Sequence, residues 1–241
     1  QPISAGVLKY DILSIPVDYP YLGVYYLIDF YREKGNLYWA GYNHLMHSIE
    51  VFDLTNRRTI QSYELEPEGP NAVLKNQISD FVVNDSLFVF RGYRNDVKVL
   101  SRKDGTLLKT IVTFSPEDNY KLNYRGTRDG SYGGLEMRWD EGKIVTPLFT
   151  KQTQTMADKL ALSVDLTTEK AEILSLSYPE EMKEDLGCYG SLTFPNFTTS
   201  EDRWVYNFAN SSRVYIYEKE TGKVQVLDMK SNATPNKAFP V

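Results

Sequence analysis

The chain has 241 residues, of which 41% are hydrophobic and 13% aromatic, a composition typical of one globular domain with a sizeable core. Its net charge of −5, without a dense cluster of Lys and Arg, excludes the basic face that nucleic-acid binding needs. No segment approaches the roughly 18 apolar residues of a membrane-spanning helix, and the single cysteine, Cys188, rules out an internal disulfide.

Repeated units organise the sequence from near its start. Residues 7–16 resemble an outermost strand that has no unit of its own. Four units follow, at about residues 24–66, 77–113, 133–178 and 189–230, and each contains four strand-like runs. We take residues 1–241 as a single domain, because no linker rich in Gly, Ser or Pro divides them.

The first two units match each other most closely. Leu27–Phe30 followed by Leu37–Tyr42 corresponds to Ile78–Phe81 followed by Leu87–Tyr93. Each unit shares an Asp-Phe pair in its first run and a Gly-Tyr pair in its second. The alternation of apolar and polar residues predicts strands with one buried face.

The third and fourth units follow the same plan less regularly. Their expected strands are Gly134–Trp139, Lys143–Phe149, Leu160–Leu166 and Ala171–Ser177, then Gly190–Phe194, Trp204–Phe208, Arg213–Glu218 and Lys223–Met229. Short polar turns, two of them containing Gly, join the third and fourth strands of the units. The pattern predicts an all-β fold, a β-propeller of four-stranded blades with about four blades present. The leftover segment 7–16 means either that the chain is part of a longer propeller, which we favour, or that this strand pairs in an unusual way.

A family resemblance agrees with these repeats. Glu68–Asn71 ahead of Ile78–Val83, and Trp204–Phe208 ahead of Val214–Tyr217, resemble Bacteroidetes lipoproteins grouped as a domain of unknown function, family 4221. The resemblance implies a TolB-like propeller, six-bladed when complete, in the periplasm or on the cell surface of a Gram-negative bacterium. The lipid-bearing cysteine of a mature lipoprotein is missing from these residues, so lipid anchoring is expected only of a parent protein. The family brings no catalytic residues.

Metal ligands are scarce in the sequence. His44 and His47 are the only histidines, and they fall in a strand connection that we expect to be solvated. Neither a zinc motif nor a calcium loop is present, so we expect no metal and no cofactor. Asp29 and Asp80 stand at the same place in two repeats, where we expect their carboxylates to accept hydrogen bonds from backbone amides between strands.

A loop rich in Arg, Tyr and Gly at residues 124–134 is the most unusual segment of the chain. Arg and Tyr are favoured recognition groups, and a propeller places such a connection at one end of its channel. The candidate ligand-binding residues are Arg91, Tyr93, Arg125, Arg128, Glu136 and Arg138. Convergence of these arginines predicts an electropositive recess for an anionic ligand; the competing interpretation spreads them over the surface, each weakly paired with an acid.

The sequence favours a non-catalytic binding or scaffold protein whose propeller face takes a protein, peptide or glycan ligand. The alternative is a propeller hydrolase or lactonase with a cation held by acids such as Asp29 and Asp80. Fold alone does not choose between them, because propellers support many functions.

Overall fold

The structure is a computed structural model. It describes residues 12–17, 25, 27–75, 78–92, 95–114, 120–121, 137–150, 159–179, 195–208 and 211–230. Within these residues regular structure consists of β-strands, without an α-helix. The predicted all-β class is therefore confirmed.

Four antiparallel sheets of four strands form the blades. Blade 1 contains β1 (Leu27–Glu33), β2 (Asn36–Asn43), β3 (Ser48–Asp53) and β4 (Arg58–Glu64). Blade 2 contains β5 (Ile78–Val83), β6 (Leu87–Gly92), β7 (Asp96–Ser101) and β8 (Leu107–Val112). All eight strands lie within a few residues of the runs that the sequence predicts, because alternation and tight turns mark both of their ends.

The other two blades depart further from the prediction. Blade 3 contains β10 (Arg138–Asp140), β11 (Lys143–Pro147), β13 (Ala161–Asp165) and β14 (Lys170–Ile173), and blade 4 contains β15 (Pro195–Thr199), β16 (Arg203–Phe208), β17 (Arg213–Glu218) and β18 (Val224–Asp228). The short strands β9 (Tyr120–Lys121) and β12 (Phe149–Thr150) pair with each other beside blade 3.

One strand assignment from the sequence is wrong. The inner strand of blade 4 is β15, Pro195–Thr199, and not Gly190–Phe194, which lies outside the described residues. The turn after Thr199 fixes this register, since the Ser200 amide donates to the carbonyl of Arg203 at 2.9 Å and Thr199 pairs with Trp204. Proline is tolerated at the first position of a strand, so Pro195 can open β15.

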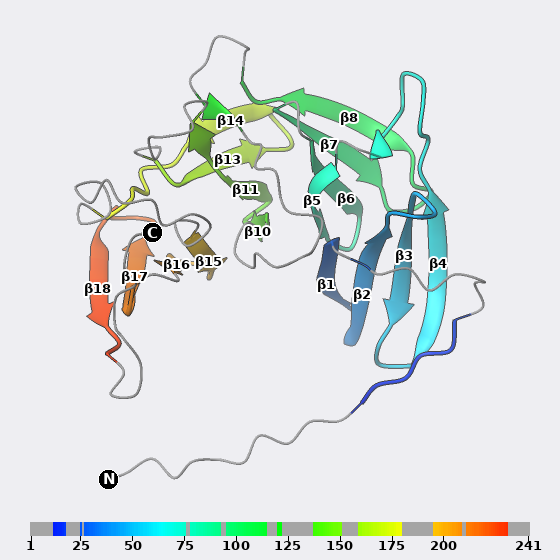
Figure 1. Cartoon of the computed structure of the whole chain (residues 1–241), viewed down its shortest axis with the longest axis horizontal. Helices are drawn as coiled ribbons and strands as arrows, with labels where there is room; N and C mark the ends of the chain where they lie inside the picture. The colour runs from blue at the N-terminus through cyan, green and yellow to red at the C-terminus, as the bar shows by residue number, and fades with distance from the viewer. Residues whose placement is uncertain are drawn as a thin grey trace, which may run out of the picture.

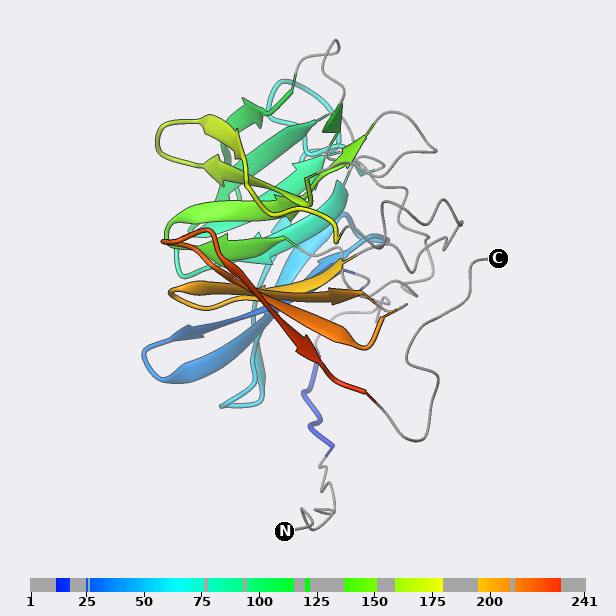
Figure 2. The same cartoon turned by 90° about the vertical axis from the view of Figure 1, so that its left-hand side faces the viewer.

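The four blades stand in sequence around an arc (Figure 1), with β1, β5, β10 and β15 toward its middle and β4, β8, β14 and β18 at its rim. This is the arrangement of β-propeller blades. Figure 2 shows the twist of the sheets, clearest where β18 crosses the direction of β15. The hydrogen-bonded sheets of the described residues leave the arc open. That the chain is part of a longer, six-bladed ring stays a prediction.

The predicted outer strand at residues 7–16 is described only from residue 12 onward. Residues 12–17 form no strand. Thr59 Oγ1 on β4 donates a hydrogen bond of 3.2 Å to the carbonyl of Pro16 and so joins this segment to blade 1.

Three apolar clusters fill the three spaces between consecutive blades. The first joins blades 1 and 2, the second joins blades 2 and 3, and the third joins blades 3 and 4. Aromatic side chains dominate the first, where Tyr42 meets Phe90 edge-to-face with ring centroids 6.1 Å apart. The hydrophobic core therefore lies between the sheets, and each blade depends on its neighbours for burial.

Charged pairs reinforce two of these three interfaces at equivalent positions. Arg102, which directly follows β7, forms an ion pair of 2.5 Å with Glu33 at the end of β1 and lies 4.6 Å above the Tyr31 ring. Lys219, which directly follows β17, forms the corresponding ion pair with Asp140 at the end of β10. Both pairs are mostly buried, so solvent screens them only in part.

The interface between blades 2 and 3 is built differently. There Lys109 of β8 donates to the carbonyl of Leu166 at 2.9 Å and lies 3.0 Å from the carboxylate of Glu169. The first and third interfaces are therefore joined by an acid at the end of an inner strand and a cation from a turn. The second is joined by a lysine from an outer strand.

We expect the Glu33–Arg102 pair to couple blades 1 and 2 measurably. A double-mutant cycle with Glu33→Gln and Arg102→Met should give a coupling free energy of about 1 kcal/mol in chemical denaturation, larger than for a typical exposed pair. The control is Arg58→Met with Asp53→Asn, a pair 3.7 Å apart in which Arg58 is mostly exposed. Equal coupling in the two cycles would contradict a special role for the inter-blade pair.

Candidate functional site

The inner strands carry the repeated aspartates, which join one blade to the next. Asp29 of β1 accepts a hydrogen bond of 2.8 Å from the amide of Phe30 through Oδ1. Its other oxygen, Oδ2, accepts one of 2.9 Å from the amide of Val83 on β5. The prediction that this aspartate satisfies backbone amides between strands is confirmed, and the second bond crosses the gap between blades 1 and 2.

Asp80 repeats this arrangement one blade later. Its Oδ1 accepts from the Phe81 amide at 2.8 Å, and its Oδ2 accepts at 2.5 Å from the amide of Met137, which directly precedes β10. Asp80 is more deeply buried than Asp29, at 6% exposure. A carboxylate in that position needs a cation or several donors to remain ionised.

Arg91 supplies the cation. Its Nη2 lies 3.4 Å from Asp80 Oδ2, its Nη1 donates to Thr146 Oγ1 on β11 at 2.8 Å, and its Nε donates to Ser79 Oγ at 3.1 Å. Only 2% of Arg91 is exposed. The guanidinium therefore binds groups of both blades 2 and 3 at the inner end of their interface, with its donors directed at protein atoms.

The six predicted ligand-binding residues fall into two groups. Arg91 and the half-buried Arg138 both belong to the junction of blades 2 and 3, where Asp80 contacts the Arg91 guanidinium and accepts a hydrogen bond from the Met137 amide, directly before Arg138. Tyr93, Arg125, Arg128 and Glu136 lie outside the described residues. Their convergence into one recess with Arg91 and Arg138 stays a prediction.

The recesses that are best formed among the described residues are small, each of about 10 Å³. That volume is close to the minimum for one water molecule. The first lies beside Arg91, Gly92 and Asp96, whose Oδ1 is buried without a hydrogen-bond partner. A Cβ atom on Gly92 would stand 1.9 Å from this oxygen, so any larger residue there requires the Asp96 side chain to move. The recess accommodates a water molecule and is too small for an organic ligand.

The histidine loop differs from the solvated loop that the sequence suggests. His47 is buried, at 7% exposure, and its Nδ1 shares a hydrogen bond of 2.7 Å with the Tyr42 hydroxyl. Burial lowers the pKa of His47, since the imidazolium would lose its hydration. The expectation that His47 is solvated is therefore wrong. The connection between β4 and β5 packs over the turn that contains His47, and the Leu65 amide donates to the His47 carbonyl at 3.0 Å.

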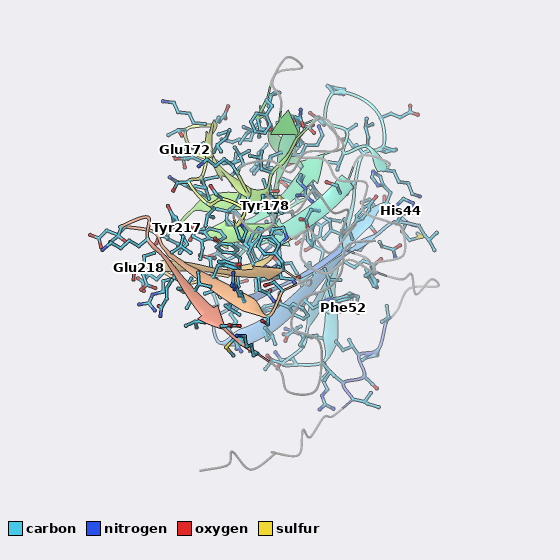
Figure 3. All side chains as sticks on the ribbon, turned by 60° about the vertical axis from the view of Figure 1, so that its left-hand side comes forward. His44, Phe52, Glu172, Tyr178, Tyr217 and Glu218 are labelled. Atoms are coloured by element: carbon cyan, nitrogen blue, oxygen red, sulfur yellow. The ribbon has the colours of Figure 1, made fainter. Side chains whose placement is uncertain are left out.

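The second histidine, His44, lies at the end of blade 1, on the opposite side of the view from Glu172 and Glu218 (Figure 3). Across the described part of the chain, His, Cys, Asp and Glu side chains form no group of three that could hold a metal ion. Nor does any helix of those residues have the length and hydropathy to cross a membrane.

A buried acid that the sequence reading missed lies on β3. Glu50 is 2% exposed. Asn43 Nδ2 donates to its Oε1 at 2.9 Å, Ser48 Oγ donates to the same atom at 3.4 Å, and the Tyr25 hydroxyl bonds to Oε2. Burial raises the pKa of Glu50, because the carboxylate loses its hydration and its hydrogen-bond donors Asn43, Ser48 and Tyr25 are neutral.

We expect Glu50 to make the protein less stable as the pH rises. Its folded-state pKa lies above the ordinary value of 4.5, so the folded protein retains the proton longer than the unfolded chain. Its favourable contribution is complete below pH 4.5 and is lost as the pH rises through the folded-state pKa. Thermal melts of Glu50→Gln should match the unsubstituted protein near pH 4 and show a higher Tm at pH 8.

The matched control is Glu64→Gln, which changes an exposed acid on β4. It should shift the Tm by a similar small amount at both pH values. A Glu50→Gln protein that is less stable at pH 8 than at pH 4, relative to the unsubstituted protein, would show that the carboxylate is stabilised by a charge partner.

The fold and the inter-blade contacts define a β-propeller assembled from four-stranded blades. Residues 7–240 match the model of the family described as a domain of unknown function, DUF4221, and the chain belongs to that family. It is similar to the crystal structure of a family member from Bacteroides vulgatus, with 15% identity and a TM-score of 0.71 over 93% of this chain. The chain spans 63% of the length of that protein.

Two further similarities are weaker. The computationally designed Ika4 protein has 11% identity and a TM-score of 0.38 over 92% of this chain and 100% of its own. The β-propeller domain of Cps50 (Swd1) from Myceliophteria thermophila has 13% identity and a TM-score of 0.46 over 88% of this chain and 57% of its own. No curated protein matches the sequence.

Proposed function

We propose that this chain acts as a non-catalytic binding or scaffold module. The face that carries its long inter-blade connections would contact a protein, peptide or glycan ligand. The observation that supports this most strongly is the difference between the two ends of the blades. At one end, tight turns such as Lys34–Gly35 and Glu141–Gly142 join the strands. At the other end β8 and β14 end and β10 and β15 begin, and residues 113–137 and 174–194 connect these strands. Binding residues concentrate in such loops, while the sheets below hold them in place.

The use of polar groups on the inner strands supports the same proposal. Asp29, Asp80 and Arg91 are engaged in holding blades together. The hydrolase alternative needs Asp29 and Asp80 to present their carboxylates to a cation, and no observation on the described residues favours it. Recognition by the connections leaves these structural contacts intact.

The chemistry of the connection 113–137 points to an anionic ligand. It carries Arg125 and Arg128 and ends beside Arg138 at the junction of blades 2 and 3. Two arginines can each make paired hydrogen bonds to a carboxylate. We further propose a TolB-like protein that works outside the inner membrane, with a lipid anchor in the parent protein. The resemblance of Glu68–Asn71 and Trp204–Phe208 to Bacteroidetes lipoproteins supports this.

The test uses an array of acidic glycans, including oligogalacturonates, and an array of acidic peptides. The unsubstituted protein should bind at least one class of carboxylate-bearing probe. The double variant Arg125→Ala, Arg128→Ala should lose that binding at least tenfold while its Tm stays unchanged, because loop residues contribute little to the core.

The control variant is Arg57→Ala with Lys103→Ala, which removes two exposed cations from turns at the opposite end of the blades. It should bind as the unsubstituted protein does. Equal binding by the loop variant, or no binding to either array, contradicts an anionic-ligand site on this connection.

A further inference from the structure

Residues 65–75, which follow β4 and lead toward blade 2, pack over the turn between β2 and β3, and we call them the strap. Leu65, Ala72 and Val73 of the strap are at most 6% exposed. Leu65 and Val73 belong to the first apolar cluster, which joins blades 1 and 2. The strap therefore covers part of this interface at the end where β4 and β8 end.

Hydrogen bonds attach the strap to the turn between β2 and β3. The Leu65 amide donates to the His47 carbonyl at 3.0 Å, and Lys75 Nζ donates to the Leu45 carbonyl at 3.0 Å. No strand of the described residues pairs with the strap. It can therefore leave the turn while the ladders of both sheets stay intact.

His47 lies in this turn beneath the strap and is buried. Its Nδ1 shares a hydrogen bond of 2.7 Å with the Tyr42 hydroxyl, and its Nε2 is buried without a hydrogen-bond partner. The carbonyls of Glu66 and Val73 in the strap favour a protonated ring, but neither meets the geometry of a hydrogen bond to Nε2. Burial outweighs their effect and lowers the pKa of His47.

The site has no place for a second proton on the ring. An imidazolium carries a hydrogen on both nitrogens, so Nδ1 would donate to the Tyr42 oxygen and Nε2 would be a charged donor without an acceptor. The Tyr42 hydroxyl, 4% exposed, could then no longer use Nδ1 as an acceptor for its own hydrogen. Both residues regain partners when water reaches them.

The charges around His47 also oppose protonation. Lys75 of the strap and the half-buried His44 of the turn both lower the pKa of His47. The acids on the neighbouring segments are Glu64, at the end of β4, and Glu66 of the strap. Both are exposed, so solvent screens their attraction for an imidazolium.

We propose that His47 is a pH-sensitive switch: its protonation releases the strap from the turn between β2 and β3 and opens this end of the interface between blades 1 and 2, while the sheets stay folded. Release of the strap hydrates the charged ring without breaking a strand ladder. The switch is additional to the binding function proposed above and does not depend on the arginines of the connection 113–137.

Proton linkage sets the direction of the switch. In the open form His47 is hydrated and has its ordinary pKa of 6.5, whereas in the closed form its pKa is lower. The closed form is therefore fully favoured above about pH 6.5 and loses stability as the pH falls from there through the closed-form pKa. Glu50 acts in the opposite direction, because its pKa is raised and its protonation at low pH stabilises the folded protein.

Amide hydrogen exchange followed by NMR tests the proposal at Leu65 and Val73, whose amides donate to the carbonyls of His47 and Glu66 in the closed strap. Their protection, relative to intrinsic exchange rates, should fall about tenfold between pH 7.5 and pH 5, because His47 in the open form is mostly protonated at pH 5. Val89, inside blade 2, should keep its protection at both pH values.

Two variants identify the group that titrates. His47→Gln keeps an acceptor for the Tyr42 hydroxyl and removes the titration, so the protection of Leu65 and Val73 should no longer change with pH. His44→Gln, the matched control, should retain the loss. It also leaves His47 as the only histidine, so its ring signal gives one titration, with a midpoint below pH 6.5 that matches the midpoint of strap opening.

Equal protection of Leu65 and Val73 at pH 7.5 and pH 5 in the unsubstituted protein would overturn the proposal. The same loss in His47→Gln assigns the opening to another group, and an equal loss at Val89 shows unfolding of the blade in place of strap release. If His47→Gln does not fold, the titration in His44→Gln decides, since different midpoints for the ring and the strap contradict the switch.

Discussion

Packing of each blade against its neighbours is the constraint on which this structure depends. An isolated four-stranded sheet with apolar residues on both faces is unstable in water, because both faces remain exposed. In this chain the three apolar clusters lie between sheets, so a blade gains its burial only when the next one is in place. The arc in Figure 1 follows from repeating one face-to-face contact.

Polar side chains hold these contacts in register. Asp29 reaches the amide of Val83 at the end of β5, and Asp80 reaches the amide of Met137 directly before β10. Each bond fixes the position of one sheet against the next. Arg91 neutralises the more deeply buried of the two acids and adds a bond to Thr146. Because these groups are committed to the scaffold, recognition of a ligand is left to the connections at one end of the blades.

The sequence predicts the strands of blades 1 and 2 closely, since strict alternation and Gly-containing turns are local signals. It also predicts the role of Asp29 and Asp80, because the same residue at the same place in two repeats indicates a shared structural role. The inner strand of blade 4 was misplaced by about one short strand, as the turn after Thr199 contains no glycine to mark it.

Burial was harder to predict than strand position. Alternation suggests one wet face for each sheet, but in a propeller both faces are covered. Loop contacts add further burial in blade 1, where the Tyr25 hydroxyl bonds to the buried Glu50 and the connection after β4 covers His47. Arg91 is the clearest case: an arginine at the end of an apolar strand suggests a ligand contact, and only the position of blade 3 shows that its donors are used inside the protein.

Amide hydrogen exchange of Val83 tests the central claim most directly, because its amide bonds to Asp29 Oδ2 of the preceding blade at 2.9 Å. If the aspartates join the blades, NMR should find Val83 protected in the unsubstituted protein. In Asp29→Ala its exchange should accelerate at least tenfold, while Val89, inside blade 2, keeps its protection. Unchanged exchange of Val83 in that variant, or equal acceleration at Val89, would contradict an aspartate link between consecutive blades.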